Sequence, residues 1–341
     1  MKGRYIIGIL LLLGCGVSDS HNNTEIEEDP YIWKEKNVFS SEIMSLELTE
    51  QNELYVATKN AVYFSTDQGQ SYSKVAIPDS LDMYKIRVIE DEVYLIARIY
   101  DPSIGGFWGG TTGWLMKTNT TFNAGWEEVS GRYNMHDVII ENGIMHIGAL
   151  SGIRNVDLST GEKWFSFLFE SQLQDKMDDM VYFGDRVLVS SHNGIYASED
   201  HGQNWIRLTE NVNKDRDHFK KMEVDENNLL YTHYKNRIYT LTNDFEWGIN
   251  YTHEDYDVFG LIEPGLLIAS EYNRVDLLIL NPGEQAEAIA TFFDRDTYAL
   301  IQEPKQIEVF ADGTVVLLDR DRLLIGTKNP ESLFWQNRAS N

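Results

Sequence analysis

Cysteine and basic residues are both scarce in this chain. Cys15 is the only cysteine among 341 residues, so no disulfide can form within the chain, and the core must hold the fold without covalent cross-links. The 29 Lys and Arg residues stand against 54 Asp and Glu, which gives a formal net charge of −25 at pH 7. Because this charge repels phosphate backbones, nucleic acid is not an expected partner.

The usual signatures of catalysis and cofactor binding are also missing. The sequence contains no Gly-x-Ser-x-Gly elbow, no phosphate-binding loop, no dinucleotide fingerprint and no His-Glu-x-x-His pair. We therefore expect no cofactor and no metal site. Whether the chain is an enzyme stays open at this stage, with the absence of activity favoured.

Apolar residues are plentiful, at 42 % of the chain with 12 % aromatic, so the chain can form a large core. The one continuous apolar run near the N-terminus, residues 6–13, follows Lys2 and Arg4. A basic start and a short apolar run predict a secretory signal over residues 1–14, since the run is too short to span a membrane. Residues 15–30 are polar and acidic, which predicts a flexible tether.

The signal ends in Leu-Leu-Gly-Cys15. This ending resembles a bacterial lipobox. The resemblance implies cleavage before Cys15, lipidation of its thiol and attachment to a membrane of the cell envelope, with the outer membrane or the cell surface favoured over the inner membrane. The alternative is that Cys15 is incidental.

The rest of the chain, residues 31–341, repeats one β-rich unit. Apolar runs that follow an acidic or glycine-containing turn begin near Leu54, Val93, Ile144, Val187, Leu229, Leu266 and Val315. Their separations run from 37 to 51 residues, a spacing that suits four-stranded propeller blades. We predict an all-β fold, a single seven-bladed β-propeller of four-stranded antiparallel blades, with six blades as the alternative. Residues 31–34 are expected to form an outermost strand beside the last blade.

Two stretches carry the pattern Ser-x-Asp-x-Gly followed by an aromatic residue, at residues 65–72 and 198–205. Short polar side chains in such a turn can bond nearby backbone N–H groups, and glycine supplies a positive φ. The pattern resembles the Asp-box, or BNR repeat, of β-propellers such as sialidases, sortilin-type receptors and photosystem II assembly factors. The resemblance implies a structural role, on the face away from the ligand, for Ser65, Asp67, Gly69, Ser198, Asp200, Gly202 and Trp205. The alternative makes the two aspartates catalytic residues or calcium ligands.

On the opposite face, six of the seven predicted second-to-third turns are minimal. The seventh, residues 101–113, is long and glycine-rich and carries Phe107 and Trp108. Loops of this length are enriched in binding roles, so Phe107 and Trp108 are candidate ligand contacts. The alternative is a loop that caps the channel.

Several His and acidic residues fall on that same face: His136, Asp137, Asp178, Asp179, His192, Asp217, His218, His253, Glu254, Asp255 and Asp257. They come from different blades and have no metal-ligand spacing, so we expect scattered polar residues rather than a metal site. A sialidase would need an arginine cluster for the sugar carboxylate. The candidates there are few: Arg132 with Tyr133, Arg216 and Arg274.

The leading hypothesis is a non-catalytic binding propeller of the bacterial envelope, attached to the membrane through a lipid anchor only, with a protein or glycan as ligand. The alternative is a carbohydrate-active enzyme, a glycoside hydrolase or lyase of sialidase type, that uses carboxylates at the channel mouth.

Overall fold

The computed structural model describes residues 30–78, 81–100, 111–150, 152–168, 177–209, 219–234, 237–252, 256, 258–271, 274–280, 287–292 and 303–339. The signal segment, Cys15, residues 16–29 of the tether, Phe107 and Trp108 lie outside these ranges, so the predictions about them stay predictions.

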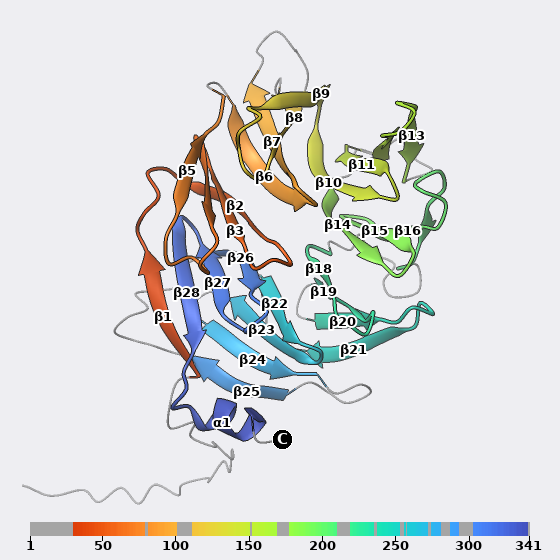
Figure 1. Ribbon diagram of the computed structural model, residues 1–341. Helices are drawn as coiled ribbons and strands as arrows, with labels where there is room; N and C mark the ends of the chain where they lie inside the picture. Colours follow the sequence, from red (N-terminus) through yellow and green to blue (C-terminus); the bar gives the residue numbers. More distant parts are fainter. Residues whose placement is uncertain are drawn as a thin grey trace, which may run out of the picture.

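The chain folds into seven four-stranded antiparallel sheets arranged as the blades of a β-propeller (Figure 1). Blade 1 consists of β2 (Ile43–Leu48), β3 (Leu54–Thr58), β4 (Ala61–Ser65) and β5 (Ser73–Ala76). Blade 2 consists of β6 (Asp82–Ile89), β7 (Glu92–Tyr100), β8 (Thr111–Asn119) and β9 (Glu127–Tyr133). Blade 3 consists of β10 (Met135–Glu141), β11 (Ile144–Ala149), β12 (Gly152–Asp157) and β13 (Lys163–Phe167).

The next three blades follow the same order from the inside outward (Figure 1). Blade 4 consists of β14 (Met177–Phe183), β15 (Arg186–Ser191), β16 (Gly194–Ser198) and β17 (Ile206–Arg207). Blade 5 consists of β18 (Met222–Val224), β19 (Leu230–Tyr234), β20 (Arg237–Leu241) and β21 (Trp247–Thr252). Blade 6 consists of β22 (Val258–Glu263), β23 (Leu266–Glu271), β24 (Arg274–Ile279) and β25 (Glu287–Phe292). Seven blades are therefore correct and the six-blade alternative is wrong, and each predicted second strand begins within one residue of the observed one.

Blade 7 closes the ring by joining the two ends of the described chain. It consists of β26 (Pro304–Val309), β27 (Val315–Asp319), β28 (Arg322–Lys328) and, as its outermost strand, β1 (Tyr31–Lys36). The antiparallel pairing of β1 with β28 is the one that the sequence predicted. The C-terminal helix α1 (Leu333–Ala339) also binds the N-terminal end of the described chain. The Trp335 indole Nε1 donates to the Pro30 carbonyl at 2.7 Å, and the Trp335 ring lies edge-on to Tyr31.

The core consists of apolar layers between neighbouring blades. The second strands are buried on both sides: every residue of β3, β19 and β27 is buried. Tryptophans after the third strands connect blades directly, since Trp126 Nε1 donates to the Ala76 carbonyl of blade 1 at 2.9 Å and Trp247 Nε1 donates to Leu208 of blade 4 at 3.0 Å. No helix in the described part of the chain has the length and apolar character needed to cross a bilayer.

The propeller has two distinct faces. The short-turn face carries the starts of the innermost strands and the second-to-third turns, six of which contain two residues. The end of β7 and the start of β8 also lie at this face. The acidic face carries both Ser-x-Asp-x-Gly turns and the first-to-second turns, whose acidic residues are Glu50, Glu53, Glu90, Asp91, Asp185, Asp225, Glu226 and Asp312.

Candidate binding site in the central channel

The innermost strands line the channel, and most of them begin with a β-bulge. Register shifts occur at the second residue of β2, β10, β14 and β26 and at the third residue of β6. A bulge inserts one extra residue and re-aims the side chains around it. The extra residues are Met44, Tyr84, His136, Asp178 and Lys305.

The residues that follow four of these bulges, and Glu223 of β18, connect their blades to a neighbour. Innermost strands expose an edge whose N–H groups need acceptors, and polar side chains supply them. Asp179 Oδ2 of blade 4, for example, accepts from the Met222 N–H of blade 5 at 3.0 Å. The same kind of bond joins Ser45 to Ile86, Asp137 to Met180, Glu223 to Leu261, and Gln306 to Leu46.

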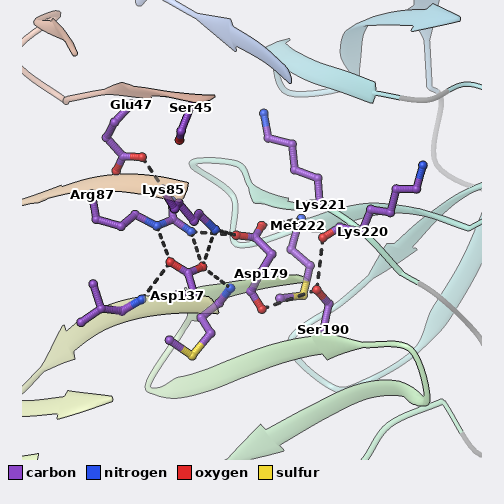
Figure 2. A network of polar contacts seen from close by, with 12 residues as sticks. Ser45, Glu47, Lys85, Arg87, Asp137, Asp179, Ser190, Lys220, Lys221 and Met222 are labelled. Carbon is purple, nitrogen blue, oxygen red and sulfur yellow. Dashed lines mark hydrogen bonds and ion pairs between the residues drawn. The ribbon is translucent and has the colours of Figure 1, made fainter. Parts of the chain in front are cut away.

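The centre of the channel contains a compact ion-pair network (Figure 2). The Arg87 guanidinium donates to both carboxylate oxygens of Asp137, at 2.7 and 2.6 Å, and to Asp179 Oδ1 at 2.7 Å. Lys85 Nζ donates to the same two carboxylates at 2.7 and 3.4 Å. Burial alone would raise the pKa of Asp137, but Arg87 and Lys85 outweigh it and hold that pKa well below its usual range. Asp137 is therefore a fixed anion.

A second cationic centre lies across the channel at Lys221. Its ammonium lies 2.5 Å from Glu223 Oε1 and 3.4 Å from Glu308 Oε1, and it donates to the Ile307 carbonyl at 2.5 Å. Burial opposes the charge on Lys221, yet the two glutamates raise its pKa above the usual range. Lys221 thus stays charged and ties blade 5 to blade 7.

Glu47 has the most unusual titration in the channel. Burial raises its pKa to about 7, Arg87 opposes the shift, and the nearby Glu308 carboxylate adds to it. The distance from Arg87 Nη1 to Glu47 Oε2 is 3.3 Å, longer than the 2.7 and 2.6 Å bonds from Arg87 to Asp137. Glu47 therefore exchanges a proton near neutral pH.

A cavity of about 710 Å³ opens from this network towards the short-turn face. The exposed Lys220 and Lys305 lie at its mouth with Tyr84, whose ring is covered by the Arg98 guanidinium at 3.9 Å. Asp178 Oδ2 lies 3.8 Å from His192 Nε2 beside them. The mouth thus carries two lysines, an acid and an aromatic ring, and Lys305 Nζ lies 3.8 Å from Glu42 Oε1.

The structure brings together only some of the residues that the sequence singled out. Asp137 and Asp179 converge on Arg87 and Lys85, so the expectation of scattered polar residues is wrong for these two. His136 is buried, 6.1 Å from the Tyr84 ring. Arg274 pairs with Asp276 at 2.7 Å and does not line the cavity.

The remaining candidates lie outside the described residues. They are the side chains of Arg132 and Tyr133, together with Arg216, Asp217, His218, His253, Glu254, Asp255 and Asp257. Within the described part, Arg87 is the one arginine that lines the cavity, and no three His, Cys, Asp or Glu side chains are grouped to hold a metal ion.

Six charged channel residues are not among those that the sequence predicted for a site: Glu47, Lys85, Arg87, Lys221, Glu223 and Glu308. Their signal is a period-two polar pattern inside the first strand of a repeat, as in Lys85-x-Arg87 and Lys221-x-Glu223. An ordinary blade strand buried on both sides would be apolar there. Charges at alternate positions of a first strand are the mark of a channel lining.

The two Ser-x-Asp-x-Gly turns share one set of hydrogen bonds. In the first, Ser65 Oγ donates to Asp67 Oδ1 at 2.8 Å and accepts from the Gly69 N–H at 2.7 Å. In the second, Ser198 Oγ donates to Asp200 Oδ1 at 2.9 Å and accepts from the Gly202 N–H at 2.8 Å. Both glycines have positive φ, +76° and +78°.

The aspartates of these turns also accept bonds from the residues that follow. Asp67 accepts from Ser71, which with Ser65 lowers the pKa of Asp67 to about 2. Asp200 accepts from Asn204 in the same way. Trp205 packs against the apolar layer between blades 3 and 4. These bonds occupy both carboxylates within their own turns.

No protein-family model matches the sequence, and no curated protein sequence is similar to it. Among solved structures, the chain is similar to virginiamycin B lyase from Staphylococcus aureus, with a TM-score of 0.65 and 11 % identity over 88 % of this chain and 100 % of that one. It is also similar to a chain of the mitotic checkpoint complex, with a TM-score of 0.65 and 9 % identity over 95 % and 99 %. A third similar structure is YCF48 bound to D1 peptide, with a TM-score of 0.61 and 12 % identity over 89 % and 98 %. At such identities the likeness shows the seven-bladed propeller fold alone, and these neighbours include a lyase as well as propellers found in complexes with proteins or peptides.

Proposed function

We propose that this chain is a non-catalytic binding propeller that presents its short-turn face to a protein partner. The observation that carries the proposal is the pairing of the deep channel charges. Asp137 and Asp179 hold Arg87 and Lys85, and they also accept backbone N–H groups of the next blade. Carboxylates used in this way stabilise the ring and are poor candidates for chemistry, while the exposed Lys220 and Lys305 line the mouth of the cavity.

The composition of the mouth favours a protein over a glycan. Lys220 and Lys305 are exposed there in a chain whose net charge is −25, so they can attract an acidic segment. Tyr84 beside them is partly exposed with Arg98 on one face of its ring, and both residue types are enriched in protein interfaces. Peptide-bound and complex-bound propellers among the structural neighbours support the same choice by analogy. Phe107 and Trp108, in the segment between β7 and β8, are proposed as additional anchors on this face.

The proposed setting is the bacterial envelope, with Cys15 lipidated and residues 16–29 as a tether that holds the propeller away from the membrane. This part rests on the lipobox-like Leu-Leu-Gly-Cys15 ending. The two Ser-x-Asp-x-Gly turns, by their resemblance to Asp-boxes, are proposed as scaffold on the face away from this partner.

The test is capture of envelope proteins by the purified chain, quantified by mass spectrometry. The Lys220→Glu/Lys305→Glu variant reverses two charges at the mouth, and the control Lys34→Glu/Lys74→Glu reverses two exposed charges on outer strands. We expect a discrete protein that the wild type and the control capture and the mouth variant loses. Equal capture by all three would refute the proposed face.

A second candidate is a carbohydrate-active hydrolase or lyase, and one observation favours it. A general acid must keep its proton near neutral pH, and Glu47, with its pKa of about 7 beside Glu308, meets that condition. Asp178 beside His192 gives a second acid at the mouth. Turnover of aryl-glycosides or polysaccharides that is lost in both Glu47→Gln and Asp178→Asn would establish this function in place of binding.

A further inference from the structure

The acidic face carries a second cavity, separate from the mouth described above. It has a volume of about 620 Å³ and meets the first cavity in the middle of the channel, where Glu47 and Arg87 line both. Its walls are the C-terminal ends of the innermost strands of blades 1 to 5. A volume of this size lies within the range of about 300–1,000 Å³ that is typical of ligand sites.

The walls of this cavity are apolar and only partly covered. Val88, Ile89, Ile140, Val181 and Val224 all line it, and each is partly exposed. A partner that covers these partly exposed apolar side chains would remove them from water, and this burial would contribute favourable free energy of binding.

The rim of this cavity is acidic, and two of its carboxylates are not neutralised by a cation of the described residues. Glu50 and Glu90 line the cavity and are exposed, and in the described part of the chain neither carboxylate has an ion-pair partner. Tyr182 completes the rim with 39 % of its surface exposed. Its pKa is raised, by burial first and then by the negative charges of Glu141 and Glu90, so the local potential is negative.

Cations near this face are already bound to acids. Lys117 Nζ lies 2.6 Å from Glu92, and Arg186 Nε lies 2.7 Å from Glu199. Arg87, at the floor, is held by Asp137 and Asp179. The rim charge of Glu50 and Glu90 is therefore not neutralised by these three groups.

We propose that the acidic-face cavity is a docking site for a basic segment of a partner protein, in which an apolar side chain enters the cavity and flanking Lys or Arg residues bind Glu50 and Glu90. A polymer with several cations fits better than a single small amine, because the acidic turns continue around the face through Asp91, Asp185, Glu226 and Asp312. Tyr182 contributes a cation–π contact at the rim. This surface lies opposite the short-turn face, so it serves a partner other than the one proposed there.

The probe is the acetylated and amidated peptide Lys-Leu-Lys-Leu-Lys, and the control peptide is Glu-Leu-Glu-Leu-Glu, both titrated calorimetrically into the whole chain. We expect binding of the basic peptide and none of the acidic one. Glu50→Gln/Glu90→Gln should weaken binding by about three- to tenfold, as for the loss of two exposed ion pairs, and Tyr182→Ala should weaken it as well. The control variant Glu226→Gln/Asp244→Asn removes the same charge from exposed positions on the same face that do not line the cavity, and it should bind like the wild type.

Three outcomes would overturn the proposal. One is no binding of the basic peptide at millimolar concentration. Another is equal weakening by the rim and control variants, which would show general charge attraction. The last is unchanged affinity in Glu50→Gln/Glu90→Gln. Because neither variant changes the short-turn face, these results leave the proposed function to its own test.

Discussion

Replacing Asp137 with Asn should destabilise the propeller more than any exposed substitution. The Asp137 side chain is fully buried and accepts from five donor groups: Arg87 Nε and Nη2, Lys85 Nζ, and the N–H groups of Val138 and Met180. An asparagine of the same shape removes the charge and turns an N–H₂ group towards the two cations. The change therefore tests electrostatics with little change in volume.

The expected magnitude follows from the charges that remain. Removing one partner of a buried ion pair costs roughly 3–5 kcal/mol, because the other partner is left buried without its counter-charge. Here Asp179 still lies 2.7 Å from Arg87 and 3.4 Å from Lys85, so the loss should fall near the lower limit, about 3 kcal/mol. The negative charge of Asp137 also raises the pKa of Glu47. Its removal should lower that pKa, so that ionised Glu47 compensates part of the charge of Arg87 and reduces the loss of unfolding free energy.

The assay is equilibrium unfolding in urea at pH 7 for the wild type, Asp137→Asn and the control Asp185→Asn, whose side chain is 90 % exposed. Surface changes of this kind usually stay within about 0.5 kcal/mol. The slope of unfolding free energy against urea should be unchanged, so the difference appears in the midpoint. A loss below about 1 kcal/mol for Asp137→Asn would refute the view that this network holds the ring together.

Three further predictions concern titration, turn geometry and attachment. The pKa of Glu47 is raised from 4.5 to about 7, so the folded state holds its proton where the unfolded state has lost it, and the stability due to this group falls as pH rises from about 4.5 to about 7. As pH rises from 5 to 8, the urea midpoint of the wild type should therefore fall relative to that of Glu47→Gln. A constant difference between the two midpoints over this range would contradict this. Gly202 and Gly125 both have positive φ, but a Cβ at Gly202 would lie 2.5 Å from Asn155 Oδ1, while one at Gly125 would meet nothing within 4 Å. Gly202→Ala should therefore be less stable than Gly125→Ala by about 1 kcal/mol or more in thermal unfolding. Equal losses of stability in the two variants would argue against the close packing around Gly202. Cys15→Ser should move the protein from the membrane pellet to the soluble fraction of the cell, and unchanged fractionation would rule out the lipid anchor.

Much of the fold could be predicted from the sequence because every blade repeats the same order of turns and apolar strands. A pattern that is weak in one blade is therefore supported by the other blades. Acidic or glycine turns before apolar runs located all seven second strands to within one residue, and the minimal second-to-third turns were found as well. The pairing of residues 31–34 with the last blade followed from the need to close a ring.

The channel site was not predictable in the same way. The sequence places Asp137 and Asp179 on the short-turn face, but their partners Lys85 and Arg87 belong to another blade, and only the packing of blades around the ring brings these strands together. The β-bulges at positions such as Tyr84 and Asp178 leave no signature in composition, yet they decide which side chains point into the channel. Long-range geometry of this kind depends on how blades pack, which a local pattern does not contain.

The proposal that the short-turn face binds a protein partner is tested most directly by cross-linking in living cells. A photo-crosslinking amino acid placed at Lys220 or Lys305, at the channel mouth, would be compared with one at Lys74 on the outer strand of blade 1. We predict one discrete protein adduct at both mouth positions and none at Lys74. Irradiation that yields no adduct at either mouth position, or the same adducts at all three, would contradict this account.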